Sequence, residues 1–404
     1  MKKLIVFAAI AATLLASCAK TVDHTRSTGQ GDALSFGVYA GRTADTKATY
    51  GDITTANLKT STDGFGVFAS YTQADDWAVT NTPNFMYNQQ VRHITSYDSA
   101  PADYTTTKYP SEWYYSPLKY WPNGQNSTAY EAAATSADKI SFFAYAPFIE
   151  TVNTVPAAGQ GITAISENTD AGIPVITFTV PAKAEEQIDL LWANPVMNAT
   201  KQALSGRVAL TFKHALSKLN LQVRTVADAL TGPTSNLANE TTVILESLTL
   251  TANGTKSGKL SIGSGNAVPN WYDLSGNTEV AYGSDSFSAT ATVNGKTGFN
   301  VTETATDLNS TKSPMIIPAA IAAGGFVITA NYWVITADSK LDGGYSTIQN
   351  NITKTSTDAM TFEAGKKYNI IVNLGINSVD FTVSEVTDWD SQTAEDYFLP
   401  QNNS

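Results

Sequence analysis

The amino-acid sequence predicts an all-β protein built from two β-sandwich domains in tandem. Charged residues make up only 15% of the chain and aromatic residues reach 10%, while Thr, Ser, Asn, Ala and Gly are abundant. This composition favours strands and turns over helices. Several segments alternate apolar and polar residues with the period of two that a strand with one buried face requires. The length of 404 residues exceeds that of most single sandwich domains, so two domains are expected.

The N-terminal segment has the form of a bacterial lipoprotein signal peptide. Lys2 and Lys3 give it a positive start, and residues 4–15 form an apolar run too short to span a bilayer. Small residues then precede Cys18, the only cysteine of the sequence. The alternative is an ordinary secretory signal that happens to carry a cysteine. We expect residues 1–17 to be removed and Cys18 to be lipidated, which would anchor the precursor to the outer membrane.

The charge balance and the absence of catalytic motifs exclude several classes of function. With 36 acidic and 25 basic residues the net charge is -11, which disfavours nucleic acid as a partner. The sequence has no nucleophile motif, no cluster of metal ligands and no paired catalytic carboxylates in a recognisable context. Residues 273–277 and 338–344 resemble fragments of calcium loops but lack the EF-hand pattern, so hairpin turns are predicted there. We therefore expect neither enzymatic activity nor a cofactor or metal.

After the expected removal of residues 1–17, the mature chain would begin with residues 18–32, a polar segment that suits a flexible tether. Leu34, Phe36 and Val38 then alternate with polar or small residues, which predicts the first strand, and residues 41–47 form an exposed loop. Further strands are predicted at residues 66–71, 140–147, 175–180, 208–212, 219–223, 244–250, 258–262, 287–293, 326–337 and 368–374.

The domain boundaries follow from this pattern of strands and turns. The first sandwich spans residues 33–226 and the second spans 240–390. Residues 227–239 carry Gly, Pro and small polar residues, which is typical of an interdomain linker. A polar tail at 391–404 follows, with one apolar island at 397–399.

Aromatic side chains crowd the region from Phe85 to Trp121. Rings beside Asn and Asp can be platforms for sugars, but such rings more often fill a sandwich core and its edges. We favour the core for most of them.

Several motifs, taken together, resemble those of a known family. The run from Phe212 to Leu219 reads Phe-x-His-Ala-x-x-Lys-Leu, and it is the most specific of them. The others are the lipobox at Cys18 and residues 142–147, 189–193, 315–318 and 362–368. In these motifs the chain resembles the fimbrillin-like families of Bacteroidia, the subunits of type V pili. The resemblance covers most of the chain and implies two transthyretin-like, Ig-like β-sandwich domains.

His214 lies inside the most specific motif, where one helical turn is expected at residues 214–217. The other histidines are His24 and His93, and no serine or carboxylate motif accompanies them. We predict a structural role in which backbone groups satisfy the ring where the strand breaks.

The resemblance implies a structural pilus subunit that is exported as a lipoprotein and polymerises with other pilus subunits. In the family an arginine-specific protease cuts the loop after the first strand. Arg42 is the arginine that follows such a strand here, and Lys47 is the runner-up for a trypsin-like protease. Cleavage would remove Leu34, Phe36 and Val38 from the core and leave a groove that invites a new strand.

The resemblance also implies that the C-terminus donates this new strand. Residues 379–383 alternate suitably, but they serve equally well as the last strand of their own domain. The better donor candidate is the segment that carries Val386, Trp389, Tyr397, Phe398 and Leu399. The alternative function is a surface glycan-binding lipoprotein or pilus-tip adhesin, with a host or bacterial surface ligand.

Overall fold

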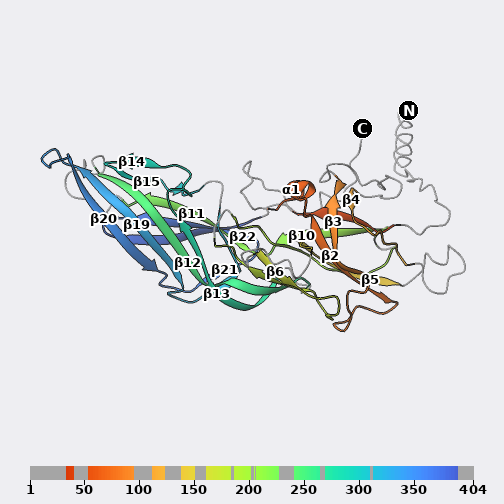
Figure 1. The fold of residues 1–404 in the computed structure, drawn as a ribbon. Coiled ribbons are helices and arrows are strands. Elements are labelled where there is room, and N and C mark those ends of the chain that lie inside the picture. Colours follow the sequence, from red (N-terminus) through yellow and green to blue (C-terminus); the bar gives the residue numbers. More distant parts are fainter. Residues whose placement is uncertain are drawn as a thin grey trace, which may run out of the picture.

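A computed structural model confirms that the protein is all-β. It describes residues 33–40, 53–94, 112–122, 138–150, 161–182, 186–201, 204, 206–226, 241–263, 269–309 and 313–389. Within these residues a single helix, α1 (Thr55–Thr60), accompanies twenty-three strands. The strands form two lobes of an elongated molecule, with the first lobe mostly orange to yellow-green and the second mostly green to blue (Figure 1).

One curled sheet makes up the first lobe. Its strand order is β1-β10-β8-β5-β2-β3-β4, with β9 beside β5, and β1 and β10 are parallel. Ala33, just before β1, forms an isolated bridge with Tyr120, beyond β4, so the two ends of the sheet approach each other. The strands are β1 (Ser35–Tyr39), β2 (Phe65–Gln73), β3 (Met86–His93), β4 (Trp113–Tyr114), β5 (Lys139–Ala146), β8 (Leu191–Ala193), β9 (Val196–Ala199) and β10 (Arg207–His214).

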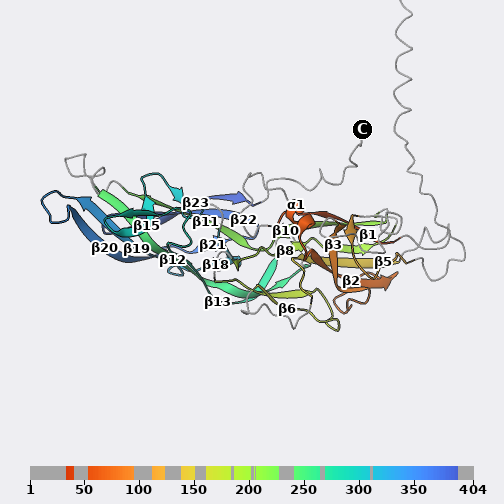
Figure 2. The same cartoon turned by 45° about the horizontal axis from the view of Figure 1, so that its top comes forward.

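The second lobe packs a five-stranded sheet against an eight-stranded sheet (Figure 2). One has the order β16-β11-β22-β23, with β17 beside β11, and the other has the order β14-β15-β12-β19-β20, with β13 and β7 also paired to β12. Leu219, Leu221 and Val223 of β11 lie in the core between them. The strands of the first sheet are β11 (Ser217–Thr225), β16 (Thr306–Asp307), β17 (Met315–Ile316), β22 (Lys366–Leu374) and β23 (Val379–Asp388).

The other sheet of the second lobe is organised around one long strand. That strand, β12 (Thr241–Ser261), alternates buried and outward residues over most of its length. Its companions are β6 (Gly161–Ile165), β7 (Val175–Thr179), β13 (Asn270–Tyr282), β14 (Ala291–Val293), β15 (Lys296–Val301), β19 (Phe326–Ala337) and β20 (Tyr345–Thr355). A small separate pair is formed by β18 (Ala319–Ile321) and β21 (Met360–Phe362).

Two segments that the sequence assigned to the first sandwich, residues 33–226, belong to the second lobe. The strand β11 pairs in parallel with β22, and the hairpin β6–β7 extends the sheet of β12. Only Ala215 and Leu216 separate β10 from β11, so the chain crosses between lobes there. This corrects the boundary predicted at 227–239, which assigned β11 and the hairpin to the first sandwich. The linker residues themselves lie outside the described residues.

Two local predictions are also corrected. The helical turn expected at residues 214–217 is a short break between two strands, because β10 ends at His214 and β11 begins at Ser217. Residues 273–277 lie inside β13, whereas residues 338–344 join β19 to β20 as a hairpin turn, as predicted. Alternation alone did not distinguish these two Asp- and Gly-containing segments.

The aromatic region of the first lobe is mostly core, as predicted. Trp113, Tyr115 and Trp121 are 4%, 2% and 2% exposed, and all three pack in the cluster inside the curled sheet. Among the described residues of this region, the aromatic side chains that stay more than a third exposed are Tyr87 and Tyr120. The rings therefore offer little surface for stacking on sugars.

Candidate strand-exchange site

The first strand, β1, is an edge strand. Within the described residues its ladder partner is β10, from Ser35 opposite Arg207 to Tyr39 opposite Thr211. The chain on either side, residues 1–32 and 41–52, lies outside the described residues. A strand paired along one side can be exchanged while the rest of its sheet keeps its hydrogen bonds.

The side chains of β1 and of its preceding residue fill the core of the first lobe. Leu34, Phe36 and Val38 are 1%, 0% and 7% exposed, which confirms the predicted buried face. The Phe36 ring makes edge contacts with three other rings, and its centroid distances are 6.1 Å to Phe65, 5.5 Å to Tyr115 and 6.2 Å to Phe142. Full burial of each apolar side chain contributes about 1.5–3 kcal/mol. Without β1, a deep apolar groove would open beside β10.

Polar contacts fix both ends of this strand. The backbone N–H of Leu34 donates to the Lys119 carbonyl at 2.9 Å, and the Tyr115 hydroxyl donates to the Leu34 carbonyl at 2.8 Å. Burial raises the pKa of Tyr115, which keeps the hydroxyl protonated as a donor. At the other end the N–H of Ala40 donates to Thr55 Oγ1 of α1 at 2.8 Å. The position of β1 therefore depends on elements besides its ladder.

The candidate cleavage residues lie between two well-defined anchors. Arg42 and Lys47 themselves fall outside the described residues. Before them the chain is held at Ala40, and after them Thr54 caps α1 in a capping box with Asn57. Cys18 also lies outside the described residues.

The C-terminal strand β23 occupies an edge of the second lobe. It pairs antiparallel with β22 from Val379 opposite Leu374 to Asp388 opposite Lys366, and Val386 lies opposite Tyr368. The first two apolar side chains of β23 pack against the core. Val379 is 6% exposed, and the centroid of the Phe381 ring lies 5.6 Å from that of the Phe326 ring. Part of the predicted donor segment is therefore already a strand of its own sheet.

The donor candidates divide into two groups. Val386 lies in β23 and Trp389, directly after it, is only 8% exposed and belongs to the core between the lobes. Tyr397, Phe398 and Leu399 lie outside the described residues. The sequence around Val386 and Trp389 did not reveal that β23 already pairs with β22.

His214 is buried, but its partner differs from the one predicted. Its Nδ1 lies 2.5 Å from Oδ2 of Asp189, whose side chain is fully buried, rather than bonding to the backbone alone. The imidazole stacks on the Trp389 indole with 4.1 Å between centroids and 4° between planes. Asp189 was not singled out as a site residue, although it begins one of the recognised motifs.

Five of the recognised motifs lie in the described residues, and these five meet at the junction of the lobes. Phe143, Trp192, Ala215, Met315 and Ile317 come from four of them and share one buried cluster with Trp389. The fifth motif joins through Gly365, whose N–H donates to the Leu216 carbonyl and whose carbonyl accepts from the Trp389 N–H. These motifs therefore have a common structural task, which is to hold the lobes and the end of β23 together.

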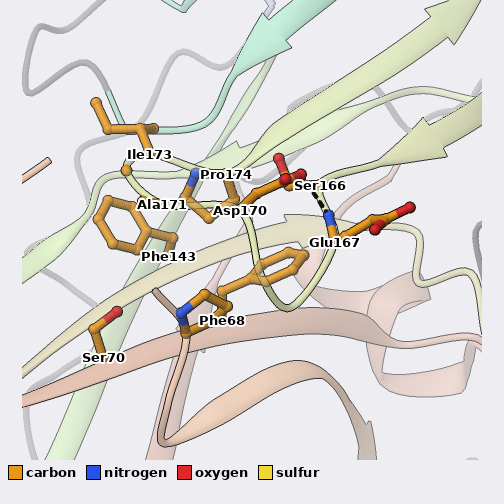
Figure 3. A pocket seen from close by; sticks show the side chains of 11 residues that line it. Phe68, Ser70, Phe143, Ser166, Glu167, Asp170, Ala171, Ile173 and Pro174 are labelled. Atoms are coloured by element: carbon orange, nitrogen blue, oxygen red, sulfur yellow. Dashed lines mark hydrogen bonds between the residues drawn. The ribbon is translucent and has the colours of Figure 1, made fainter. Parts of the chain in front are cut away.

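Other features of the described residues give no sign of a catalytic or cofactor site. A small hollow under the loop that joins β6 to β7 is lined by Phe68, Phe143, Ser166 and Asp170, and the Asp170 carboxylate accepts from the Glu167 N–H at 2.7 Å (Figure 3). No group of three or more His, Cys, Asp or Glu side chains comes together in the described part of the chain. No described helix has the length and apolar character needed to cross a membrane.

Comparison with known proteins places these features in a family context. A family model described as fimbrillin-like matches residues 46–389. The Fimbrium subunit Fim1C of Phocaeicola vulgatus is 26% identical, with 83% of each chain covered. A crystal structure of a fimbrial protein from Bacteroides vulgatus superposes with a TM-score of 0.60 at 24% identity, covering 88% of this chain and 99% of that one.

Proposed function

Because this chain belongs to the fimbrillin-like family, we propose that it is a structural subunit of a cell-surface type V pilus, polymerised by strand exchange and supporting adhesion. The observation that carries the proposal is β1, an edge strand whose side chains fill the core. A subunit that loses such a strand must bury the exposed groove again. The partners are therefore other pilus subunits. The family also supports a structural rather than a catalytic role.

The first step is export as a lipoprotein that is anchored in the outer membrane through Cys18. The apolar run and small residues before Cys18 support this step. Cys18→Ala should abolish incorporation of a fatty-acid analogue and leave the signal peptide uncleaved by the lipoprotein peptidase. Label that persists on this variant would contradict the anchor.

The second step is cleavage after Arg42, with Lys47 as the runner-up. The cut would break the covalent connection between β1 and α1, so that β1 and the lipidated N-terminus would be held by the ladder with β10 and by non-covalent contacts such as the Ala40–Thr55 hydrogen bond. Sequencing the N-terminus of surface-assembled protein tests this step, and Thr43 should be the first residue. A terminus that remains at Cys18 would instead indicate an anchor subunit that keeps its lipid.

The third step is donation of the C-terminal tail to the groove of a neighbour. Val386 and Trp389 are engaged in their own lobe, so we assign the donor role to the tail that carries Tyr397, Phe398 and Leu399. Tyr397 is the eighth residue after Trp389, and eight residues of fully extended chain span about 28 Å. This reach suits a contact between adjacent subunits.

Deleting residues 391–404 tests the donor role directly. The truncated subunit should be exported and cleaved but should not be extended by another copy, so electron microscopy should find no long filaments. The melting temperature of the uncleaved monomer should barely change, because the deletion begins beyond Trp389, the last buried side chain described. Filaments of normal length would overturn the donor role, and a large loss of monomer stability would assign the tail to its own fold.

The glycan-binding alternative has less support. Most rings between Phe85 and Trp121 are buried, so a sugar would find few of them at the surface. Specific retention of the uncleaved monomer on a glycan array would favour this alternative over a purely structural role.

A further inference from the structure

The end of β23 is held by a group of side chains that we call the junction clamp, formed by Asp189, His214, Lys218 and Trp389. The Trp389 indole lies parallel to the His214 imidazole at 4.1 Å, and Lys218 Nζ lies 5.2 Å from the indole centroid. The backbone N–H of Trp389 also donates to the Gly365 carbonyl at 2.8 Å. The last described residue of the chain is thus held through both its ring and its backbone.

Asp189 links this clamp to the N-terminal part of the chain, at Ile53. Its Oδ2 atom lies 2.5 Å from His214 Nδ1 and also accepts from the Ile53 N–H at 3.3 Å. Ile53 is the first described residue after the candidate cleavage segment. One buried carboxylate therefore contacts both the chain that follows the cleavage residues and the ring on which Trp389 rests.

The clamp is more stable in place than detached. Releasing Trp389 would expose its indole, remove the stacking partner of a buried histidine and uncover the Asp189–His214 pair. It would also break the hydrogen bond from the Trp389 backbone N–H to the Gly365 carbonyl, next to the last ladder pair of β22 and β23 at Lys366 and Asp388. The physical expectation is that Trp389 stays fixed while the chain beyond it remains available to a partner.

We propose that the junction clamp is the fixed base from which the C-terminal tail leaves the subunit, and that Trp389 is the positioning residue that sets the register of the donated strand. The inference rests on the proposed donor role of the tail. A displacement of the base by one residue, about 3.3 Å along a strand, turns every apolar side chain to the opposite face. A donor tail that starts from a loose base would therefore enter the groove in several registers.

The test separates giving a strand from receiving one. The donor species is the uncleaved subunit, whose groove is filled by β1. The acceptor species is the cleaved subunit that lacks residues 391–404. Mixing them should give one-to-one complexes, measured by size-exclusion chromatography with light scattering. Trp389→Ala is placed in either species, and Trp389→Phe tests rescue because a phenyl ring can still stack on His214.

The matched control is Trp271→Ala. Trp271 packs in the same junction and its Nε1–H donates to the Ala215 carbonyl at 2.8 Å, but it lies on β13 and is not part of the junction clamp. In the donor, Trp389→Ala should slow complex formation about tenfold, a loss typical of reduced preorganisation. In the acceptor it should have little effect, Trp389→Phe should restore most of the rate, and Trp271→Ala should act equally weakly in both species.

The inference would be overturned if Trp389→Ala leaves donation unchanged, if it impairs both species equally, or if Trp271→Ala reproduces its effect in the donor. Faster donation by Trp389→Ala would show that the clamp restrains the tail instead of positioning it, and would also overturn the inference. Failure of the unmodified species to form a tail-dependent complex would contradict the proposed function itself, which is a separate result.

Discussion

The strand β1 is the first of its lobe and β11 is the first of its sheet, and each pairs in parallel with a strand that comes much later in the chain. β1 lies beside β10, and β11 lies beside β22. They differ in their other neighbours, because β11 also pairs with β16 and β17 and continues almost directly from β10. β1 is an edge strand, and the candidate cleavage residues Arg42 and Lys47 follow it in the sequence.

This comparison shows that burial alone does not decide whether a strand can be exchanged. Phe36 of β1 and Leu219 of β11 are both 0% exposed, so both contribute fully to a core. Removing β1 breaks one ladder, whereas removing β11 would break the connection between β16, β17 and β22. For the proposed strand exchange, the single ladder of β1 and its connection to the next element by a loop favour β1 over β11 as the strand that is replaced.

The largest expected effect comes from truncating one buried side chain in each strand. Phe36→Ala should lower the free energy of unfolding of the uncleaved subunit by about 3–5 kcal/mol, and Leu219→Ala by about 2–5 kcal/mol. After cleavage and loss of β1, the Phe36→Ala protein should be identical to the unmodified one, whereas Leu219→Ala should remain destabilised. Urea unfolding of both forms checks this. A Phe36→Ala effect that persists after cleavage would mean that β1 stays bound.

A smaller effect is expected from the hydroxyl that holds the start of β1. Tyr115→Phe removes the hydrogen bond to the Leu34 carbonyl and should destabilise the uncleaved subunit by about 1 kcal/mol. Release of β1 after cleavage should become about fivefold faster, if this bond is broken before the strand leaves. Mass spectrometry of the released peptide measures the rate. An unchanged rate would show that the bond breaks only after release is committed.

The smallest effect concerns acid and the segment that precedes β4. The hydrogen bond between His93 and Glu112, at 3.0 Å, lowers the pKa of the Glu112 carboxyl from its ordinary value. A carboxyl with a lowered folded-state pKa adds stability above its unfolded pKa of about 4.3, and that stability is lost as the pH falls through the folded value. The Glu112 side chain is 69% exposed, so solvent screening limits the effect to about 0.5 kcal/mol or less.

Glu112→Gln provides the measurement for this last effect. The variant should be slightly less stable than the unmodified subunit at pH 7, and this difference should shrink as the pH falls through the folded-state pKa, because the carboxyl is then protonated in both states. A difference in stability that does not change with pH would show that the carboxylate charge is not involved. Leu219→Ala serves as the control, since an apolar truncation in β11 should cost the same at each pH relative to its parent.

The sequence predicted much of the fold and the buried face of the first strand. The alternation of Leu34, Phe36 and Val38 correctly identified three core side chains. It could not identify β10 as their partner strand, because the residues that pair lie far apart in the sequence. The boundary between domains was misplaced for a related reason. The alternation before and after Ala215 and Leu216 has the same period, so nothing in the pattern marks the passage from one lobe to the other.

The candidate site was predicted less completely. The motif around His214 pointed to a buried histidine, but its partner Asp189 and its contact with Trp389 arise only when three distant segments meet. Trp389 was assigned to the donor segment because residues 379–383 could be the last strand of their own domain, which left residues 386–399. In the folded chain β23 continues along β22 as far as Asp388, and Trp389, the next residue, packs in the core of the junction.

The sequence by itself determined which side chains face a core, because a strand with one buried face must alternate apolar and polar residues. It also determined the all-β class and the positions of the motifs. Tertiary structure alone decided which strand lies at an edge, which segment enters the other lobe and where β23 ends. The physical reason is that strand pairing uses backbone N–H and C=O groups, which nearly every residue carries alike. Side-chain patterns therefore record burial, while the choice of neighbour depends on the packing of the whole molecule.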